Sequence, residues 1–438
     1  MLIVLGVVAL LITLAFAFVG APHLFRTTPV RRVVGMDSDT TSLDFASDEL
    51  VNALRLTVQT ALEPGSTAEL LNNGDGTFER LWRDLHAARH SITIVSYFGT
   101  PGEVTDMLAT ILADRARAGV EVRWVYDGVG SGTLADDYFA PIREAGVRTA
   151  TFRAVRGHTL DRVNNRTHVR SVVIDGTIGY TGGFGFDDNW LGDGCSGGQW
   201  RDCNVRLTGP VVGSLLAAFI THWAEAANEL IVSESLARGQ PGGNVGHSPA
   251  ERAVPLALAG VMLSRGAMGS SAAERLLATT IALSRRSLLI TNAYFIPGDD
   301  LIDLLVEARQ RAVDVRVLTN GARTDVMLAL WAGRRRYERL LEAGIRIFEY
   351  QPALLHAKTI VADGAWSVVG TINFDNRSLA FNNEISLIAL DPTFAAQLEG
   401  QFQADTALAQ EIDLARFRRR SLRHRLLEQT ATLLSRWL

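Results

Sequence analysis

The sequence predicts an α/β protein of two similar halves behind an apolar N-terminal segment. Helix-like stretches alternate with short β-branched runs, this order of elements occurs twice, and each half carries one His-x-(Lys/Arg)-x4-Asp pattern. With 47% hydrophobic and 21% charged residues over 438 positions, the chain is globular rather than disordered or built on disulfides. Its net charge of −4 gives no support for nucleic acid as a partner.

The first half shows a strand–helix–strand order, which normally gives parallel strands covered by helices. Amphipathic stretches are typical of helices, and short β-branched runs are typical of buried strands. The expected elements are a helix at 78–90, a strand at 91–97, a helix at 104–118 and a strand at 120–126. Residues 47–62 are helix-like as well and are interpreted as a stalk or leading helix.

The second half repeats this order, with a helix at 272–284, a strand at 287–293, a helix at 301–311 and a strand at 313–318. The last strand, Val-Asp-Val-Arg-Val-Leu, nearly repeats the Val-Glu-Val-Arg-Trp-Val of the first half. A period of about 190 residues indicates a domain duplication rather than a solenoid. The predicted organisation is an anchor at 1–21, a juxtamembrane stalk at 22–65, a first half at 66–238, a linker at 239–250, a second half at 251–415 and a basic amphipathic helix at 416–438.

Residues 2–19 form an uncharged apolar run that, as a helix, is about long enough to cross a bilayer. A cleaved secretory signal is the alternative, but no basic residue precedes the run. Arg26, Arg31 and Arg32 follow it, so the positive-inside rule places the body of the protein on the cytoplasmic side. We therefore expect a single-pass protein of a bacterial-type inner membrane.

The C-terminal segment combines clustered arginines with leucines at helical spacing. A basic helix of this kind suits an anionic lipid surface, and a terminal helix packed on its own domain is the equal alternative. The arginines are 416, 418, 419, 420, 423 and 425, and the apolar positions are Leu426, Leu427, Leu433, Leu434, Trp437 and Leu438.

The doubled motif carries the predicted chemistry. His168 and Arg170 precede Asp175 in the first half, and His356 and Lys358 precede Asp363 in the second. On a strand, residues two apart point to the same side, so each histidine shares a face with its cation. Two histidines and two cations in one cleft suit a phosphate ester: the cations hold phosphate oxygens, one histidine attacks phosphorus and the other protonates the leaving oxygen. This chemistry needs no metal or cofactor, and no metal-ligand spacing is present.

Four carboxylates accompany these motifs. Asp175 and Asp363 belong to the motif, but each precedes a glycine, and a turn-forming role is the favoured interpretation. Asp202 and Glu384 follow the glycine turn of each half. Either could accept the Nδ1 proton of a catalytic histidine and fix its tautomer, with a surface position as the alternative.

The doubled pattern resembles the phospholipase D superfamily, and within it the bacterial cardiolipin synthases, over residues 66–438. The resemblance implies a phosphatidyl–histidine intermediate in which His168 attacks, His356 protonates, and Lys358 and Asn373 bind phosphate. It also implies phospholipid substrates, with phosphatidylglycerol expected. Supporting stretches are 73–78, 127–131, 200–206 with 209–210, 292–297, 341–350 and 370–378.

Three features depart from that family. Arg170 stands where the family has lysine, Gly185 stands where it usually has asparagine, and one apolar span replaces two. The chain uses arginine at every basic position except Lys358, so Arg170 follows a general bias and Lys358 marks a position that needs a compact ammonium. Gly185 removes a donor, which predicts weaker phosphate binding in the first half.

The expected function is that of a phosphatidyltransferase of the cardiolipin synthase type. The alternatives are a phospholipase D hydrolase that releases phosphatidic acid, a phosphodiesterase acting on nucleic acid, and a decayed homologue that only binds lipid. The sequence assigns no role to Cys195 and Cys203, and it predicts that His86, His90 and His222 are structural or exposed, while His158 is left open.

Overall fold

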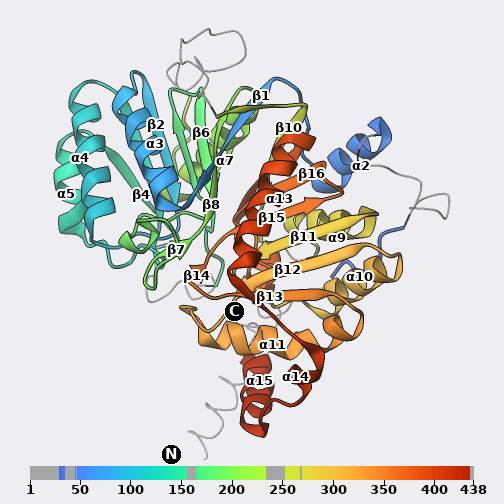
Figure 1. Cartoon of the computed structure of the whole chain (residues 1–438). Coiled ribbons are helices and arrows are strands. Elements are labelled where there is room, and N and C mark those ends of the chain that lie inside the picture. The colour runs from blue at the N-terminus through green and yellow to red at the C-terminus, as the bar shows by residue number, and fades with distance from the viewer. Residues whose placement is uncertain are drawn as a thin grey trace, which may run out of the picture.

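Two mixed sheets form the framework of the computed structural model, which describes residues 29–34, 45, 47–154, 164–232, 252–266 and 269–434 (Figure 1). The first sheet has the strand order β4-β3-β2-β5-β6-β8-β1-β9. Its strands are β1 (Ser66–Asn72), β2 (Ser91–Ser96), β3 (Glu121–Asp127), β4 (Arg148–Phe152), β5 (Ser171–Ile174), β6 (Ile178–Gly182), β8 (Cys203–Thr208) and β9 (Val254–Leu256).

The second sheet has the order β10-β17-β16-β15-β11-β12-β13-β18, which repeats the first when it is taken from β13 to β10. Its strands are β10 (Leu258–Ser264), β11 (Ser287–Asn292), β12 (Asp314–Asn320), β13 (Arg346–Tyr350), β15 (Lys358–Ala362), β16 (Trp366–Gly370), β17 (Glu384–Leu390) and β18 (Ala409–Glu411). The duplication expected from the sequence is therefore present in the topology.

The sheets are mixed, and the strands of the strand–helix–strand units are parallel, as their order predicts. Only β2, β3 and β4, and their counterparts β11, β12 and β13, pair in parallel. The remaining pairs in these two sheets are antiparallel; a tight turn joins β5 to β6, whereas β2 and β5 are antiparallel neighbours that lie far apart in the sequence. The helical crossovers seen in the sequence occur only in the parallel part.

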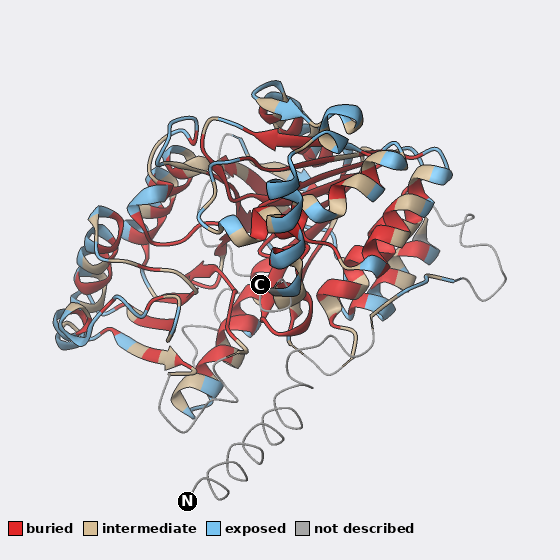
Figure 2. Cartoon of the chain, turned by 90° about the horizontal axis from the view of Figure 1, so that it is seen from below, coloured by how far each residue is buried: buried red, intermediate tan, exposed pale blue. Residues whose placement is uncertain are grey.

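Helices cover both faces of each sheet. The outer face of the first sheet carries α3 (Asn73–Ala87), α4 (Glu103–Arg117) and α5 (Asp136–Glu144), and that of the second carries α9 (Ala272–Leu283), α10 (Asp299–Gln310) and α11 (Met327–Glu342). Between the sheets lie α7 (Val211–Ala227) and α13 (Pro392–Ala407), whose apolar side chains form one core with both sheets. Figure 2 shows buried residues concentrated in the sheets and in the helices packed on them.

The chain passes from the first sheet to the second at residue 257, between β9 and β10. Strand β9 pairs with β1 of the first sheet, and β10 then begins the second. Helix α2 (Asp48–Val58), expected as a stalk, buries Leu50, Leu54 and Val58 in the core of the second half. The C-terminal segment forms two helices, α14 (Leu414–Arg418) and α15 (Leu422–Leu434).

Among the described residues, no helix has the length and apolar character needed to cross a bilayer. The apolar run at 2–19, which the sequence predicts to be such a helix, lies outside those residues, as do the linker at 239–250 and His158.

Candidate active site between the two halves

The two motif histidines face one cavity of about 520 Å³ between the halves. His168 lies just before β5 and His356 just before β15, so equivalent strands of the two sheets deliver them to the same space. Arg170 and Asn373 also line the cavity, together with an apolar wall that includes Phe98, Trp190, Trp200, Ile296 and Val326. The cavity therefore combines a charged reaction centre with room for an apolar group.

His168 has its proton on Nδ1. Its Nδ1 lies 3.0 and 3.1 Å from the two carboxylate oxygens of Glu384, and its Nε2 lies 3.1 Å from Nη1 of Arg170. Because a guanidinium only donates, Nε2 must accept, and Nδ1 donates to Glu384. Burial, followed by the charge of Arg170, holds the pKa of His168 well below its usual value. The imidazole is thus neutral with its lone pair on Nε2, the form a nucleophile needs.

His356 is oriented in the same way by a different acid. Its Nδ1 lies 2.9 Å from Oδ2 of Asp202, and Trp190 Nε1 donates to the same oxygen at 2.7 Å. Burial raises the pKa of Asp202, but the attraction and hydrogen bond of His356 outweigh it and bring that pKa to about 2. Burial and Lys358 lower the pKa of His356 to about 3 against the opposing effect of Asp202. Asp202 is therefore a fixed negative charge behind the second histidine.

Each histidine takes its carboxylate from the opposite half of the molecule. Glu384 begins β17 of the second sheet and Asp202 precedes β8 of the first. The backbone follows the same exchange, because His168 N donates to the carbonyl of Asn383 and His356 N donates to that of Arg201, at 2.8 and 2.7 Å. A short parallel pair, β7 (Trp200–Arg201) with β14 (Leu354–Leu355), joins the halves beside the cavity. Neither half alone contains a complete histidine–carboxylate pair.

The two cations are buried beside the histidines. Lys358 is 3% exposed, and its Nζ donates to the backbone oxygen of His356. Burial lowers the pKa of Lys358 to about 7, although Asp202 opposes this. Burial also lowers the pKa of Arg170, with Asp202 and Glu384 opposing. Oδ1 of Asn373 is buried, and among the described residues it has no hydrogen-bond partner, so it stays available within the cavity lining.

Gly185 occupies the position equivalent to Asn373, and the structure shows why no larger residue stands there. A Cβ at Gly185 would lie 2.9 Å from the ring of Trp190. That indole fills the space and donates to Asp202, the role that the Thr371 hydroxyl has toward Glu384 in the second half. The first half is therefore built differently at this point, with its carboxylate still held by a donor.

Asp175 and Asp363, grouped with the catalytic residues by the motif, do not line the cavity. They lie at the far ends of β5 and β15, where both adopt a positive φ of about 50° in the turn that follows. The Asp175 carboxylate accepts the backbone N–H groups of Arg89, His90 and Ser91 at 2.7–2.9 Å. Asp363 does the same for residues 285–287. The geometry agrees with the turn-forming interpretation.

Replacing Asp175 with alanine is therefore expected to lower the free energy of unfolding by about 3 kcal/mol, because three backbone donors lose their acceptor. Urea denaturation in detergent measures this. Glu79→Ala is the matched control, since Glu79 pairs with Arg83 on the exposed surface and its loss should cost less than about 0.5 kcal/mol. Equal effects of the two substitutions would contradict the structural role of Asp175.

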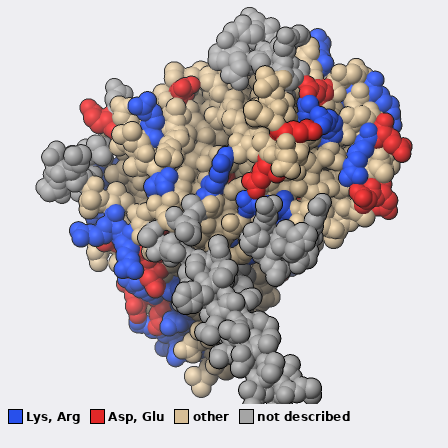
Figure 3. Space-filling view, turned by 180° about the vertical axis from the view of Figure 1, so that it is seen from behind, with Lys and Arg blue, Asp and Glu red and all other residues tan. Residues whose placement is uncertain are grey.

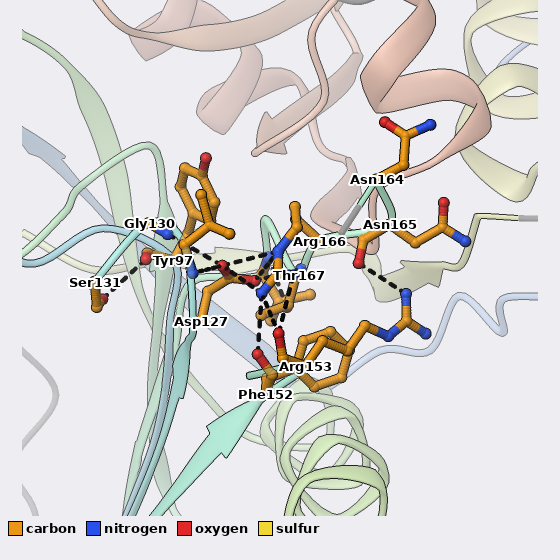
Figure 4. Close-up of polar contacts among 12 residues, drawn as sticks. Tyr97, Asp127, Gly130, Ser131, Phe152, Arg153, Asn164, Asn165, Arg166 and Thr167 are labelled. Atoms are coloured by element: carbon orange, nitrogen blue, oxygen red, sulfur yellow. Dashed lines mark hydrogen bonds and ion pairs between the residues drawn. The ribbon is translucent and has the colours of Figure 1, made fainter. Parts of the chain in front are cut away.

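A buried ion pair that the sequence analysis did not identify holds the two residues that precede His168 in place. Figure 4 shows this ion pair and its hydrogen-bond partners. Arg166 pairs with Asp127 at 2.9 Å, and the N–H of Thr167 donates to the same carboxylate at 3.0 Å. Asp127 also accepts the N–H of Gly130, a residue of the cavity wall, at 3.1 Å. One carboxylate thus ties the cavity wall to the residue before His168.

His222, expected to be structural or exposed, is buried behind the same segment. Its Nδ1 donates to the carbonyl of Ala218 at 2.7 Å, so its Nε2 accepts from Thr167 Oγ1 and Asn383 Nδ2 at 3.0 and 3.2 Å. Burial lowers its pKa to about 4, which keeps the ring neutral. His222 therefore links the two segments that hold His168. In the sequence, the only indication that His222 is buried was its position in an apolar helical stretch.

Known proteins with similar sequences or folds were found. A family model described as "Cardiolipin synthase, PLD-like domain" matches residues 277–406. The chain is 32% identical over 392 residues to the cardiolipin synthase of Geobacillus kaustophilus, with 87% of this chain and 75% of that relative covered. It is also 32% identical over 396 residues to cardiolipin synthase 2 of Bacillus anthracis, covering 89% and 73%. In fold it resembles phosphatidylserine synthase of Haemophilus influenzae, with a TM-score of 0.66 at 15% identity, covering 88% of this chain and 99% of that one.

Proposed function

Because the chain belongs to the cardiolipin synthase family of phospholipase D-like proteins, we propose that it is a phosphatidyltransferase that joins two phosphatidylglycerol molecules. The observation that carries the proposal is the pair of buried histidines, each held by a carboxylate of the opposite half, on one cavity. Such a pair supplies a nucleophile and a proton donor on two sides of a phosphodiester.

In the first step Nε2 of His168 attacks phosphorus, and the bond between phosphorus and the glycerol head group breaks. The departing oxygen takes a proton from Nε2 of His356. The negative phosphodiester raises the pKa of His356 when it binds, which loads this proton, and Asp202 stabilises the imidazolium. Arg170 moves from His168 Nε2 to the phosphate oxygens, where Lys358 and the Nδ2 group of Asn373 donate further hydrogen bonds.

In the second step a hydroxyl of another phosphatidylglycerol replaces the histidine. The hydroxyl loses its proton to Nε2 of His356 and its oxygen attacks phosphorus. The phosphorus–nitrogen bond breaks, which frees His168 and leaves cardiolipin. Glu384 balances the positive charge on the phosphorylated imidazole while the intermediate exists.

The cavity lining supports a lipid over a nucleic acid. Phe98, Trp190, Ile296 and Val326 give an apolar wall next to the charged centre, as a glycerolipid requires. On the face seen in Figure 3, basic and acidic side chains lie interspersed rather than forming a basic track. Together with the net charge of −4, this disfavours a long polyanion as substrate.

The site residues present support phosphoryl transfer through histidine. Among the described residues there is no group of three or more His, Cys, Asp or Glu side chains that could hold a metal ion. The chemistry above uses only side chains of this chain.

The protein is proposed to work at the cell membrane, attached by the apolar segment at 2–19 with its body on the cytoplasmic side. The support is the length of that segment and the arginines that follow it, Arg26, Arg31 and Arg32. Protease accessibility of the body in inside-out membrane vesicles tests the orientation: cleavage without detergent is expected.

Turnover of phosphatidylglycerol vesicles by the full-length protein tests the proposed reaction, with lipids identified by mass spectrometry. Cardiolipin and glycerol are expected, with and without EDTA. Phosphatidic acid as the main product would identify water as the acceptor and make the protein a hydrolase. Turnover that EDTA abolishes would overturn the metal-free mechanism, and the absence of any turnover would leave a lipid-binding homologue.

The pH dependence of kcat/KM tests the role of Lys358. Its pKa of about 7 means that the free protein loses this positive charge as pH rises through neutrality, so phosphate binding weakens on the alkaline side. Glu384, whose pKa burial raises to about 8, gains its negative charge in the same range. Lys358→Arg keeps a cation at all these pH values, so the fall of kcat/KM on the alkaline side is expected to shift to higher pH. If kcat/KM falls at the same alkaline pH in both proteins, the assignment of this fall to Lys358 is contradicted.

A further inference from the structure

Helix α15 has two apolar faces, of which the protein covers only one. Leu427 is half-buried and Ala431 is 1% exposed, and this face packs on α11. Leu422, Leu426 and Leu433 are 81%, 62% and 76% exposed. Their spacing of four and seven residues places them on one stripe, on the opposite side of the helix from Ala431.

Packing inside the protein accounts for the inner face alone. Ala431 joins a small apolar cluster with Ile296, Ala329 and Ala332, and Glu428 is buried in an ion pair with Arg420 at 2.9 Å. These contacts fix the helix below α11, at the lower end of the molecule in Figure 1. The outer leucines add nothing to them, so the stripe needs another explanation.

The arginines near the leucine stripe fall into two groups, those paired with acidic side chains of the protein and those left exposed. Arg418 and Arg420 pair with Glu338, Glu342 and Glu428. The exposed Arg416, Arg419, Arg423 and Arg425 have no acidic partner within the described part of the chain. By helical spacing Arg423 and Arg425 flank the leucine stripe on both sides, and Arg419 lies in the turn that joins α14 to α15. An apolar stripe bordered by uncompensated positive charge is complementary to an anionic lipid surface.

We propose that α14 and α15 lie on an anionic bilayer surface, with the leucine stripe in the boundary between head groups and acyl chains. Ala431 on the inner face of α15 belongs to the same apolar cluster as Ile296 and Ala329, and both of these residues also line the cavity. Docking by the outer face of this helix therefore holds the apolar wall of the cavity about one helix diameter from the membrane. The proposal concerns a surface outside the cavity and holds whether or not the phosphatidyl transfer proposed above occurs.

A fluorescent reporter in the full-length chain tests this contact independently of the N-terminal segment. In a Cys195→Ser background, Leu426→Cys carries the probe NBD, and Gln403→Cys on the exposed side of α13 is the matched control. Each protein is reconstituted into phosphatidylcholine vesicles with or without phosphatidylserine, an anionic lipid that is not the proposed substrate. Spin-labelled lipid then reports whether the probe enters the bilayer.

Quenching and a blue shift at position 426, but not at 403, are expected with phosphatidylserine. Replacing Arg416, Arg419 and Arg423 with glutamine should reduce quenching toward the level in pure phosphatidylcholine, since each arginine near an anionic surface strengthens binding by a factor of about five. Equal, weak quenching at 426 and 403 would overturn the proposal. A blue shift that follows protein concentration in detergent and ignores lipid charge would assign the stripe to a contact between copies, and would also overturn it.

Discussion

Replacing His168 with alanine is expected to prevent formation of the covalent intermediate, whereas His356→Ala is expected to block the proton transfers to the leaving oxygen and from the acceptor hydroxyl. The distinction follows from the proton positions, because Arg170 leaves Nε2 of His168 as a lone pair while no such donor faces Nε2 of His356 among the described residues. With phosphatidylglycerol both variants should lose a factor on the order of 100 to 10,000. The natural substrate therefore does not separate the two roles.

A phosphatidyl ester of p-nitrophenol separates them, because its leaving group departs without a proton. His356→Ala should release one equivalent of nitrophenol in a burst and then stop, since the acceptor hydroxyl has no base. Mass spectrometry of the digested protein should find the phosphatidyl group on His168. His168→Ala should show no burst. The reverse pattern would exchange the roles of the two histidines, and a burst in neither variant would refute a covalent intermediate.

The elements and the two histidines that line the cavity could be predicted because the signals for both are local. The strand expected at 120–126 is observed at Glu121–Asp127, and its repeat at 313–318 is observed at Asp314–Asn320. His168 and His356 were found from a pattern of eight residues. The antiparallel pairing of the other strands was not predicted, because neighbours such as β2 and β5 lie far apart in the sequence and no local signal pairs them.

Local sequence signals could not predict which carboxylate pairs with which histidine. Asp202 and Glu384 were named as acids that could orient a histidine, but not which histidine each would reach. The observed pairs are 216 and 154 residues apart and cross between the halves. Gly185 was interpreted as a lost donor, and only the packed structure shows that Trp190 fills its space and donates to Asp202.

The two crossed carboxylates are expected to act on different steps, which gives the second large effect. Glu384 faces His168, the proposed nucleophile, so Glu384→Gln removes the acid whose ionisation balances the positive charge of the proposed intermediate. Asp202 faces the proton-transferring histidine, so Asp202→Asn weakens protonation of the leaving oxygen. An acid-to-amide change at a histidine partner costs a factor on the order of 10,000 in a known triad, and we expect losses on the order of 100 or more here on phosphatidylglycerol.

The activated ester again resolves the steps. Glu384→Gln should slow the nitrophenol burst by nearly the same factor as turnover, while Asp202→Asn should keep a burst close to that of the unmodified protein and lose only the slow second phase. Glu79→Gln, on the exposed surface, is the matched control and should change neither phase. Equal loss of the burst in both acid variants would mean that the carboxylates serve the fold of the cavity rather than separate chemical steps. Because each acid comes from the half opposite its histidine, a split result would also show that both halves take part in each step.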